Sequence, residues 1–433
     1  MQNIPRFSIH RNIFHRKQFT RLLLSVILIV ITVFTLVIYS PLEEAKRLEK
    51  SGDYVKALKV LEIWPGFPFA DELTQREALL VKLRLYLSLK EFENAKTVLK
   101  QFRPASKDYQ PAVLSVFDTS VKSGQLKFAE LLIQEILQNS GEPLYQLTSR
   151  LAGLYWSMGR FEEAADLTPR LLAGAVNPVA ILKLDIANDL RAARPMIQIS
   201  NLKRLETRQP DDRGIQLGLA RLELISGETE SSRKRISSLI INNPNRSEWL
   251  IWRDIAFMTG RLDDLTLALE KLATPFNDTK WFIRIAQLLR MNLPAQILGN
   301  LEEQQLSIDS LESLAELAAL AGDRNLAERL RSKKKIRDQA FEEYRRILTL
   351  KQNLNQNADK IRMMNLSERA GLLDHFRVWQ ILVDTEFSDS DAIRKKLENL
   401  WQERDKLIAK QRISPKGTRI KTKSNSELSW KSL

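Results

Sequence analysis

The fold of this chain is decided by residues 151–167, which read LAGLYWSMGRFEEAADL. Two small residues, Ala152 and Ala164, lie twelve positions apart on either side of a turn that begins at Gly159. Small residues let two helix backbones cross closely, and glycine ends a helix because it adopts positive φ at no steric cost. This stretch therefore predicts two successive helices joined by a short turn, with Phe161 packed back into their crossing.

The same spacing recurs along the chain. Residues twelve apart flank a turn at Ala45 and Ala57, Leu83 and Ala95, Phe117 and Ala129, Ala220 and Ser232, Arg253 and Leu265, and Ala315 and Ala327. The turn positions are 52, 90, 124, 159, 227, 260 and 322. The gap after 159 is twice the usual spacing and predicts a degenerate unit turning near 193–195, and the gap after 260 predicts another turning near 293–294.

Prolines mark the same period independently. They fall at Pro104, Pro143, Pro178, Pro210, Pro244 and Pro275, separated by 31 to 39 residues. Proline is disfavoured inside helices, so a regular series of prolines indicates loops between units. The two periods together predict about nine helical pairs between residues 42 and 331, each of which buries its apolar face against its neighbours.

This pattern resembles the tetratricopeptide repeat, a helical hairpin of about 34 residues marked by small residues, a turn glycine, an aromatic and a closing proline. The resemblance rests on spacing more than on identities, since Phe117, Arg253 and Leu265 stand where the family prefers small residues. It implies an all-α fold, a right-handed α-solenoid of such hairpins, and a role in binding other proteins.

The charge of the chain is concentrated at its ends. The net charge is +14, and residues 1–21 and 410–433 supply eleven of these units, which leaves +3 on the body. A body so close to neutral does not favour a phosphate-binding surface. The chain has no cysteine, so disulfides, thiolate nucleophiles and cysteine-ligated metals are excluded.

Residues 22–40 form a run of 19 uncharged, mostly apolar residues, about the length of a membrane-spanning helix. A cleavable signal peptide is the alternative, but the apolar run is long and Ser40 is preceded by Ile38 and Tyr39 and followed by Pro41, so an uncleaved anchor is favoured. The preceding segment, 1–21, is a basic tail without acids. By the positive-inside rule the tail lies in the cytoplasm and the rest across the membrane, which in a bacterium means the inner membrane and the periplasm.

The period fails after Arg331. The basic run at 331–337 is interpreted as a solvated helix face, with contact to anionic lipid as the alternative. Three longer helices are expected near 335–356, 366–384 and 389–411, so that 332–411 forms a helical cap on the solenoid, with a coiled-coil element as the alternative. Residues 412–433 are expected to be a basic disordered tail.

No pattern of catalytic or metal-ligating residues is found. His375 is the only histidine outside the N-terminal tail, and no nucleophile motif, metal-ligand cluster or phosphate-binding loop accompanies it. A structural histidine is therefore favoured over a catalytic base. We expect no enzyme activity, no cofactor, no metal and no small-molecule substrate.

Candidate partner-binding residues come from the resemblance alone. In that family, side chains from the first helix of each pair face the partner, which in this sequence gives Arg84 and Leu87, Asp118 and Val121, Gly153 and Trp156, Arg221 and Leu224, and Asp254 and Phe257. The predicted groove consists of Arg84, Asp118, Trp156, Arg221, Asp254 and Phe257. The alternative for Trp156 and Phe257 is packing between neighbouring pairs.

The sequence thus favours a single-pass, membrane-tethered scaffold on the periplasmic side that binds other proteins of an envelope assembly, secretion or polysaccharide-export complex. Its lipid contact would be residues 22–40. A nucleic-acid-binding α-repeat protein is the alternative, and an α-superhelical hydrolase is less favoured because no catalytic constellation supports it.

Overall fold

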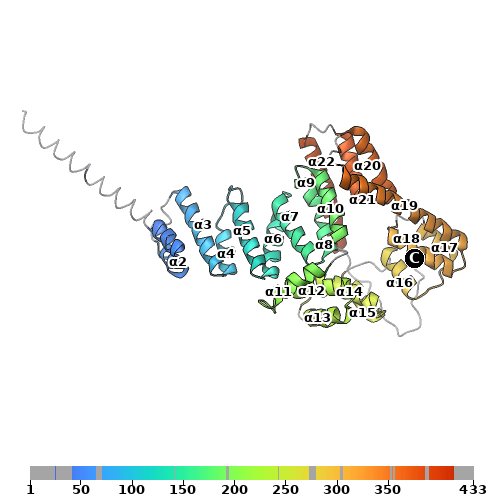
Figure 1. Cartoon of the computed structure of the whole chain (residues 1–433), viewed down its shortest axis with the longest axis horizontal. Coiled ribbons are helices and arrows are strands. Elements are labelled where there is room, and N and C mark those ends of the chain that lie inside the picture. Colours follow the sequence, from blue (N-terminus) through green and yellow to red (C-terminus); the bar gives the residue numbers. More distant parts are fainter. Residues whose placement is uncertain are drawn as a thin grey trace, which may run out of the picture. The chain divides into compact units, whose positions relative to one another are not determined.

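The computed structural model describes Ser25 and residues 41–64, 71–140, 142–191, 195–241, 243–272, 279–302, 306–351, 354, 356–385 and 390–413. Within these ranges all regular secondary structure is α-helical, as the sequence predicts (Figure 1). None of the helices described there is long and apolar enough to cross a bilayer. The expected anchor at 22–40, apart from Ser25, lies outside the described residues, as do the basic tail at 1–21 and residues 414–433.

The predicted turns share one backbone geometry. At the turn of the central repeat, the Arg160 N–H donates to the Tyr155 carbonyl at 2.9 Å, and Gly159 between them has φ +69°. This is the Schellman motif, which satisfies carbonyls at the end of a helix. All seven predicted turn positions adopt positive φ: Gly52, Lys90, Gly124, Gly159, Gly227, Gly260 and Gly322.

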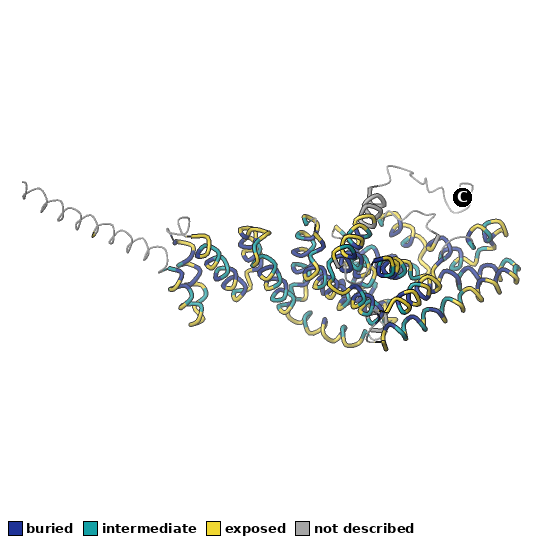
Figure 2. Tube along the Cα trace, turned by 90° about the horizontal axis from the view of Figure 1, so that it is seen from above, coloured by how far each residue is buried: buried dark blue, intermediate teal, exposed yellow. Residues whose placement is uncertain are grey.

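The fourteen residues of the twelve-apart pairs are all buried in the hairpins. Seven of them are 0% exposed (Ala45, Ala57, Ala95, Ala129, Ala220, Ser232 and Ala315), and the other seven are 1–6% exposed. Larger residues occupy some of these positions without leaving the interior, since Phe117 is 4% and Arg253 6% exposed. Burial recurs along one side of each helix, as Figure 2 shows. The spacing read from the sequence is therefore a packing pattern.

The chain divides into two compact units, 1–123 and 124–433, where the sequence predicted one continuous solenoid over 42–331. In unit 1, helical residues 41–51 precede four helices that contact their neighbours in chain order. These are α2 (Tyr54–Glu62), α3 (Glu72–Ser88), α4 (Phe92–Leu99) and α5 (Tyr109–Lys122). The Asp71 side chain caps α3 by accepting from the Thr74 N–H at 2.7 Å.

Unit 2 contains the remaining helices. They are α6 (Leu126–Asn139), α7 (Tyr145–Ser157), α8 (Phe161–Asp166), α9 (Thr168–Gly174), α10 (Pro178–Arg191), α11 (Met196–Glu206), α12 (Arg213–Ile225), α13 (Thr229–Ile241), α14 (Arg246–Met258), α15 (Leu262–Lys271), α16 (Thr279–Leu288), α17 (Ala295–Glu302), α18 (Ile308–Leu320), α19 (Arg324–Leu350), α20 (Asn357–Ala370), α21 (Leu373–Asp384) and α22 (Ser390–Ile413). Contacts follow chain order through most of the unit, but α12 also packs on α6, and α22 packs on α9.

The C-terminal helices pack differently from the expected cap. A cap would cover the last repeat, whereas one hydrophobic core joins α9 and α10 to α19, α20, α21 and α22. Its fully buried members include Leu182 and Ala173 from the middle of the chain and Tyr344 and Trp379 from its C-terminal part. The chain therefore returns on itself within unit 2, because the apolar faces of α9 and α10 are covered by helices about 150 or more residues later in sequence.

Four predicted boundaries need correction. The expected end of the repeats at Arg331 falls inside α19, since nothing in 331–337 ends a helix. The expected helix at 366–384 is broken at Gly371 (φ +76°), and α22 continues through Ile413 into the expected tail. The second divergent unit turns at Arg290 (φ 50°), before the expected 293–294.

The first degenerate unit does not form the expected hairpin. The predicted turn at 193–195 lies between the end of α10 and the start of α11, and only Pro195 of this turn is described. However, α10 packs mainly on α9 and α19, whereas α11 packs on α12. At this point the fold departs from a regular repeat stack.

Candidate interaction surfaces

The predicted groove residues of unit 1 are separate from each other. The exposed Arg84 makes a two-pronged ion pair with Glu49, with its Nε 2.7 Å and its Nη2 2.8 Å from the carboxylate oxygens. This pair bridges the first and second helical pairs of the unit. Asp118 is half-buried on α5, and the neighbouring groove position Leu87 is buried.

Two predicted groove residues of unit 2, Arg221 and Asp254, belong to one ion cluster. Arg221 on α12 approaches Asp254 on α14, with its Nη1 2.5 Å from the Oδ2 atom. Arg253 also contacts Asp254 at 2.7 Å and reaches Glu162 on α8 at 3.0 Å. Burial alone would raise the pKa of Asp254, but Arg253 and Arg221 more than offset this effect and hold it below its usual range. These charges neutralise one another and tie α8, α12 and α14 together.

The two predicted aromatic contacts serve packing in this structure. The half-buried Trp156 stacks against Phe161 of its own hairpin, with ring centroids 4.8 Å apart. Phe257 meets the edge of Trp281 in the next hairpin at 6.0 Å, and Arg284 lies over its ring at 5.5 Å. Both rings retain partial exposure, so a partner-binding role for them stays a prediction.

A second buried ion cluster was not foreseen from the sequence. Arg160, in the turn after α7, is 3% exposed and donates through Nη2 to Glu130 on α6 at 2.8 Å and to Ser247 on α14 at 2.6 Å. Its guanidinium also lies 4.3 Å from the centroid of the Tyr155 ring. Burial would raise the pKa of Glu130, but Arg160 and Lys127 hold it below its usual range. The only sequence signal is a basic residue beside a turn glycine, which does not identify partners about 30 and 90 residues away.

His375 belongs to a hydrogen-bonded relay that closes unit 2. Its Nδ1 lies 2.8 Å from the Tyr344 hydroxyl and its Nε2 lies 2.9 Å from Asp185 Oδ2 on α10, while Trp379 Nε1 donates to the Tyr344 oxygen at 2.9 Å. An indole N–H can only donate, so Tyr344 accepts from Trp379. The Nε2-protonated tautomer would donate to Asp185 and accept from Tyr344 at Nδ1.

The relay resembles an acid–histidine–hydroxyl arrangement, but its hydroxyl is enclosed. Tyr344 and Trp379 are both 0% exposed, and burial raises the pKa of Tyr344, which makes its hydroxyl a poorer nucleophile source. A substrate has no access to that oxygen. The relay therefore supports the structural interpretation of His375, with Asp185 as the partner that sequence reasoning missed. In the described part of the chain, no group of three or more histidine, aspartate or glutamate side chains is placed to hold a metal ion.

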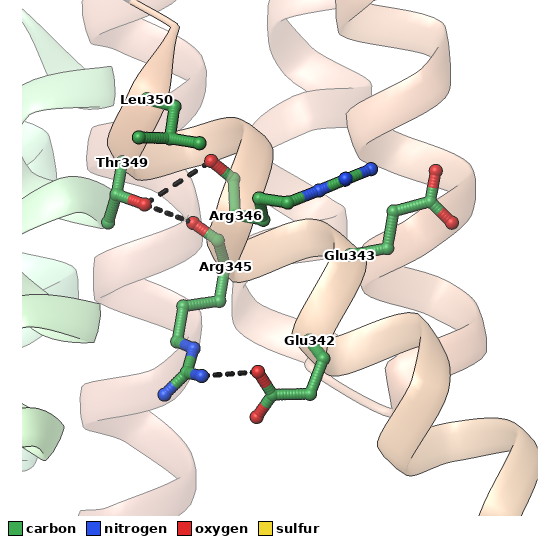
Figure 3. A pocket seen from close by; sticks show the side chains of 6 residues that line it. All are labelled: Glu342, Glu343, Arg345, Arg346, Thr349 and Leu350. Carbon is green, nitrogen blue, oxygen red and sulfur yellow. Dashed lines mark hydrogen bonds and ion pairs between the residues drawn. The ribbon is translucent and has the colours of Figure 1, made fainter.

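Two shallow hollows lie along the exposed side of α19. The C-terminal hollow, of about 740 Å³, is lined by Glu342, Glu343, Arg345, Arg346, Thr349 and Leu350 (Figure 3). Its charges are largely paired, since Arg345 contacts Glu342 and Arg362 from α20 contacts Glu343 at 2.5 Å. The N-terminal hollow, of about 560 Å³, is lined by Asn325, Glu328, Arg329, Ser332, Lys333 and Ile336.

A row of exposed apolar side chains marks the ends of successive helices in unit 2. We call this row the apolar edge, and it consists of Ile225, Met258, Leu289 and Leu320, which are 36–56% exposed. Each residue stands one or two positions before a turn residue of positive φ. Because α12, α14, α16 and α18 contact one another in that order, their C-terminal ends share one side of the stack.

Ile225, Met258 and Leu320 stand two residues before their turns, and the same position in the earlier hairpins is polar. Two residues before their turns stand Lys50, Ser88, Lys122 and Ser157, all of them exposed. Since the position is open to solvent in both groups, helix packing does not require an apolar side chain there. The apolar edge is therefore a surface feature of the later hairpins that the fold itself does not explain.

Comparison with known proteins gives little further information. No protein-family model matches the chain, and no curated protein matches it. Among solved structures, it is similar to the crystal structure of the TPR domain of P58(IPK), with 14% sequence identity over 86% of this chain and 99% of that chain, and a TM-score of 0.24. The assignment of an all-α helical-repeat fold therefore rests on the turns and packed hairpins of the chain itself.

Proposed function

We propose that this protein is a non-enzymatic scaffold whose helical hairpins bind another protein through the apolar edge. The observation that carries the proposal is the change at one solvent-exposed position, which is polar in the early hairpins and apolar in the later ones. Exposed apolar side chains gain free energy when a partner removes them from water, at roughly 25 cal/mol per Å² of buried area. A row that spans four hairpins suits a partner surface better than a small molecule.

The enclosed hydroxyl of the His375 relay and the mutually paired charges near Asp254 also favour binding over catalysis. Helical repeats bind partners through such extended surfaces. The predicted groove residues Trp156 and Phe257 remain secondary candidates, because each retains exposed area beside its packing contact.

The finer part of the proposal concerns location. Residues 22–40 would anchor the scaffold in a membrane with the repeats on the non-cytoplasmic side, where it would serve an envelope assembly, secretion or export complex. The support is the uncharged apolar run and the basic tail before it. An anchor would raise the effective concentration of the repeats for other membrane-bound proteins.

The decisive experiment is crosslinking and recovery of the full-length chain from its native cells. Replacing three edge residues together, M258S/L289S/L320S, should abolish recovery of the partner polypeptide while the helical circular dichroism is kept. The matched control is I197S/I241S, which replaces apolar residues that are more exposed but stand away from the edge. Equal recovery with both variants would reject the apolar edge. Extraction of the wild type from membranes at alkaline pH would contradict the anchor.

A further inference from the structure

The positive charge of the body is concentrated on one helix. The 27 residues of α19 contain nine lysines and arginines and four acids, a net charge of +5. The whole body between residues 22 and 409 carries only +3, so everything else in it sums to −2. The densest part is 329–337, which holds six basic residues and no acid.

Half of these six basic residues are engaged within the fold. Arg329 pairs with Glu302 at 3.0 Å, Lys334 with Asp338 at 3.2 Å, and Arg337 donates to the Leu306 carbonyl. The other three are Arg331, Lys333 and Lys335, all exposed and without an ion pair in the part of the chain that the structure describes. We call these three residues the basic face of α19.

The basic face is unfavourable for the helix itself. Arg331 and Lys335 stand four positions apart, and like charges at that spacing repel on a helix surface. Neither residue packs in the core, since the buried side of α19 consists of Leu326, Leu330, Tyr344 and other apolar residues. The fold therefore gives no reason for three unpaired cations here, whereas a binding partner of opposite charge would.

The N-terminal hollow adjoins this charge and adds other features. Lys333 lines it together with the amide of Asn325, the hydroxyl of Ser332 and the side chain of Ile336, which is 51% exposed. Cationic, hydrogen-bonding and apolar groups in one hollow match a polypeptide that presents carboxylates beside an apolar side chain. We propose that the basic face and the N-terminal hollow of α19 bind an acidic segment of a partner protein.

Two other anionic partners fit these observations less well. A helix that lies in a lipid surface needs a free apolar side, but the apolar side of α19 is buried in the fold. A nucleic acid presents phosphates along its length, whereas the basic face is confined to residues 331–335 of one helix. The inference rests on the proposed scaffold function and specifies the chemistry of one bound segment.

The test uses the full-length chain in neutral phosphatidylcholine nanodiscs and a fluorescent peptide of repeated Asp-Glu-Leu units. Anisotropy should show binding that weakens at least about tenfold in K333E/K335E and also weakens when salt shortens the screening length from about 10 Å to about 3 Å. The control variant K203E/K234E makes the same change of net charge on exposed lysines of α11 and α13 and should retain wild-type affinity. A peptide of Lys-Arg-Leu units should not bind.

Four results would overturn the inference. The first is that the peptide does not bind, and the second is that K333E/K335E and K203E/K234E lose peptide binding equally. The third and fourth are that the chain binds anionic phosphatidylglycerol vesicles, or a DNA oligonucleotide, instead of the peptide. This inference and the scaffold function can fail separately, because the scaffold function is tested by a different experiment. That experiment compares recovery of the crosslinked partner by the wild type and by M258S/L289S/L320S. If K333E/K335E binds the peptide normally while that triple variant loses the partner, only the acidic-segment inference is rejected.

Discussion

The two units of this chain are built from the same hairpin but are held together differently. In unit 1 every helix contacts its neighbours in chain order, and ion pairs such as Arg84–Glu49 join residues 35 positions apart. In unit 2 the Asp185–His375 contact joins residues 190 positions apart, and Arg170 lies 4.8 Å from the Trp401 ring centroid. Unit 1 is a local stack, whereas unit 2 is closed by contacts between distant segments.

This difference shows what a repeat pattern encodes. The turn glycines and small residues specify each hairpin and its nearest neighbour, so they determine a stack of any length. Closure depends on single side chains that do not repeat, such as His375 and Trp379, which join α21 to α10 and α19. Cooperativity should therefore extend across distant helices in unit 2 and only between neighbours in unit 1.

The largest effect on stability is expected from Trp379→Ala, which tests the closure of unit 2. Trp379 is 0% exposed and donates to Tyr344, so its loss should destabilise unit 2 by about 3–5 kcal/mol. Because one core joins the two segments, hydrogen exchange should accelerate in α9 and α10 as well as in α19 to α22, while α3 and α4 keep their protection. Unchanged exchange in α9 and α10 would mean that the closure is not cooperative.

A smaller effect is expected from two matched glycine substitutions. Gly159 and Gly227 both have positive φ, but a Cβ at Gly159 would lie 2.8 Å from the buried Leu222 side chain, whereas one at Gly227 meets nothing within 4 Å. Gly227→Ala should cost about 1 kcal/mol from backbone strain, and Gly159→Ala about 2–3 kcal/mol because Leu222 must also shift. Denaturant melts of the two variants measure the difference. Equal costs would show that the α7–α12 contact tolerates displacement.

The smallest effect concerns pH in unit 1. Burial, with a hydrogen bond to Glu62, raises the pKa of Tyr86 from 10.0 to about 12. The folded state thus favours the protonated phenol, so its contribution to stability is complete below pH 10 and disappears as pH rises to about 12. Thermal melts of wild type and Tyr86→Phe should differ in their slope over this window, with a flatter dependence for the variant. Parallel curves would contradict the role of Tyr86.

The candidate site was predictable only in part. The groove positions taken from the family resemblance include Arg221 and Asp254, which lie together, but the structure engages them with each other and with Arg253. The sequence could not reveal this pairing because a charged residue on a helix has many possible partners until the helices are placed. The apolar edge was visible in principle, since Ile225, Met258 and Leu320 stand at one fixed offset from the turns.

The sequence by itself determined the hairpins. Turn residues such as Gly159 and small residues such as Ala152 act through hydrogen bonds and packing within a few helical turns, so their effect is written in local spacing. Only the tertiary structure decided that the chain forms two units and that α19 to α22 return to α9 and α10. The apolar face of a helix shows that another element must cover this face, but it does not show which helix does so. That choice depends on the fit of side chains brought together from distant parts of the chain.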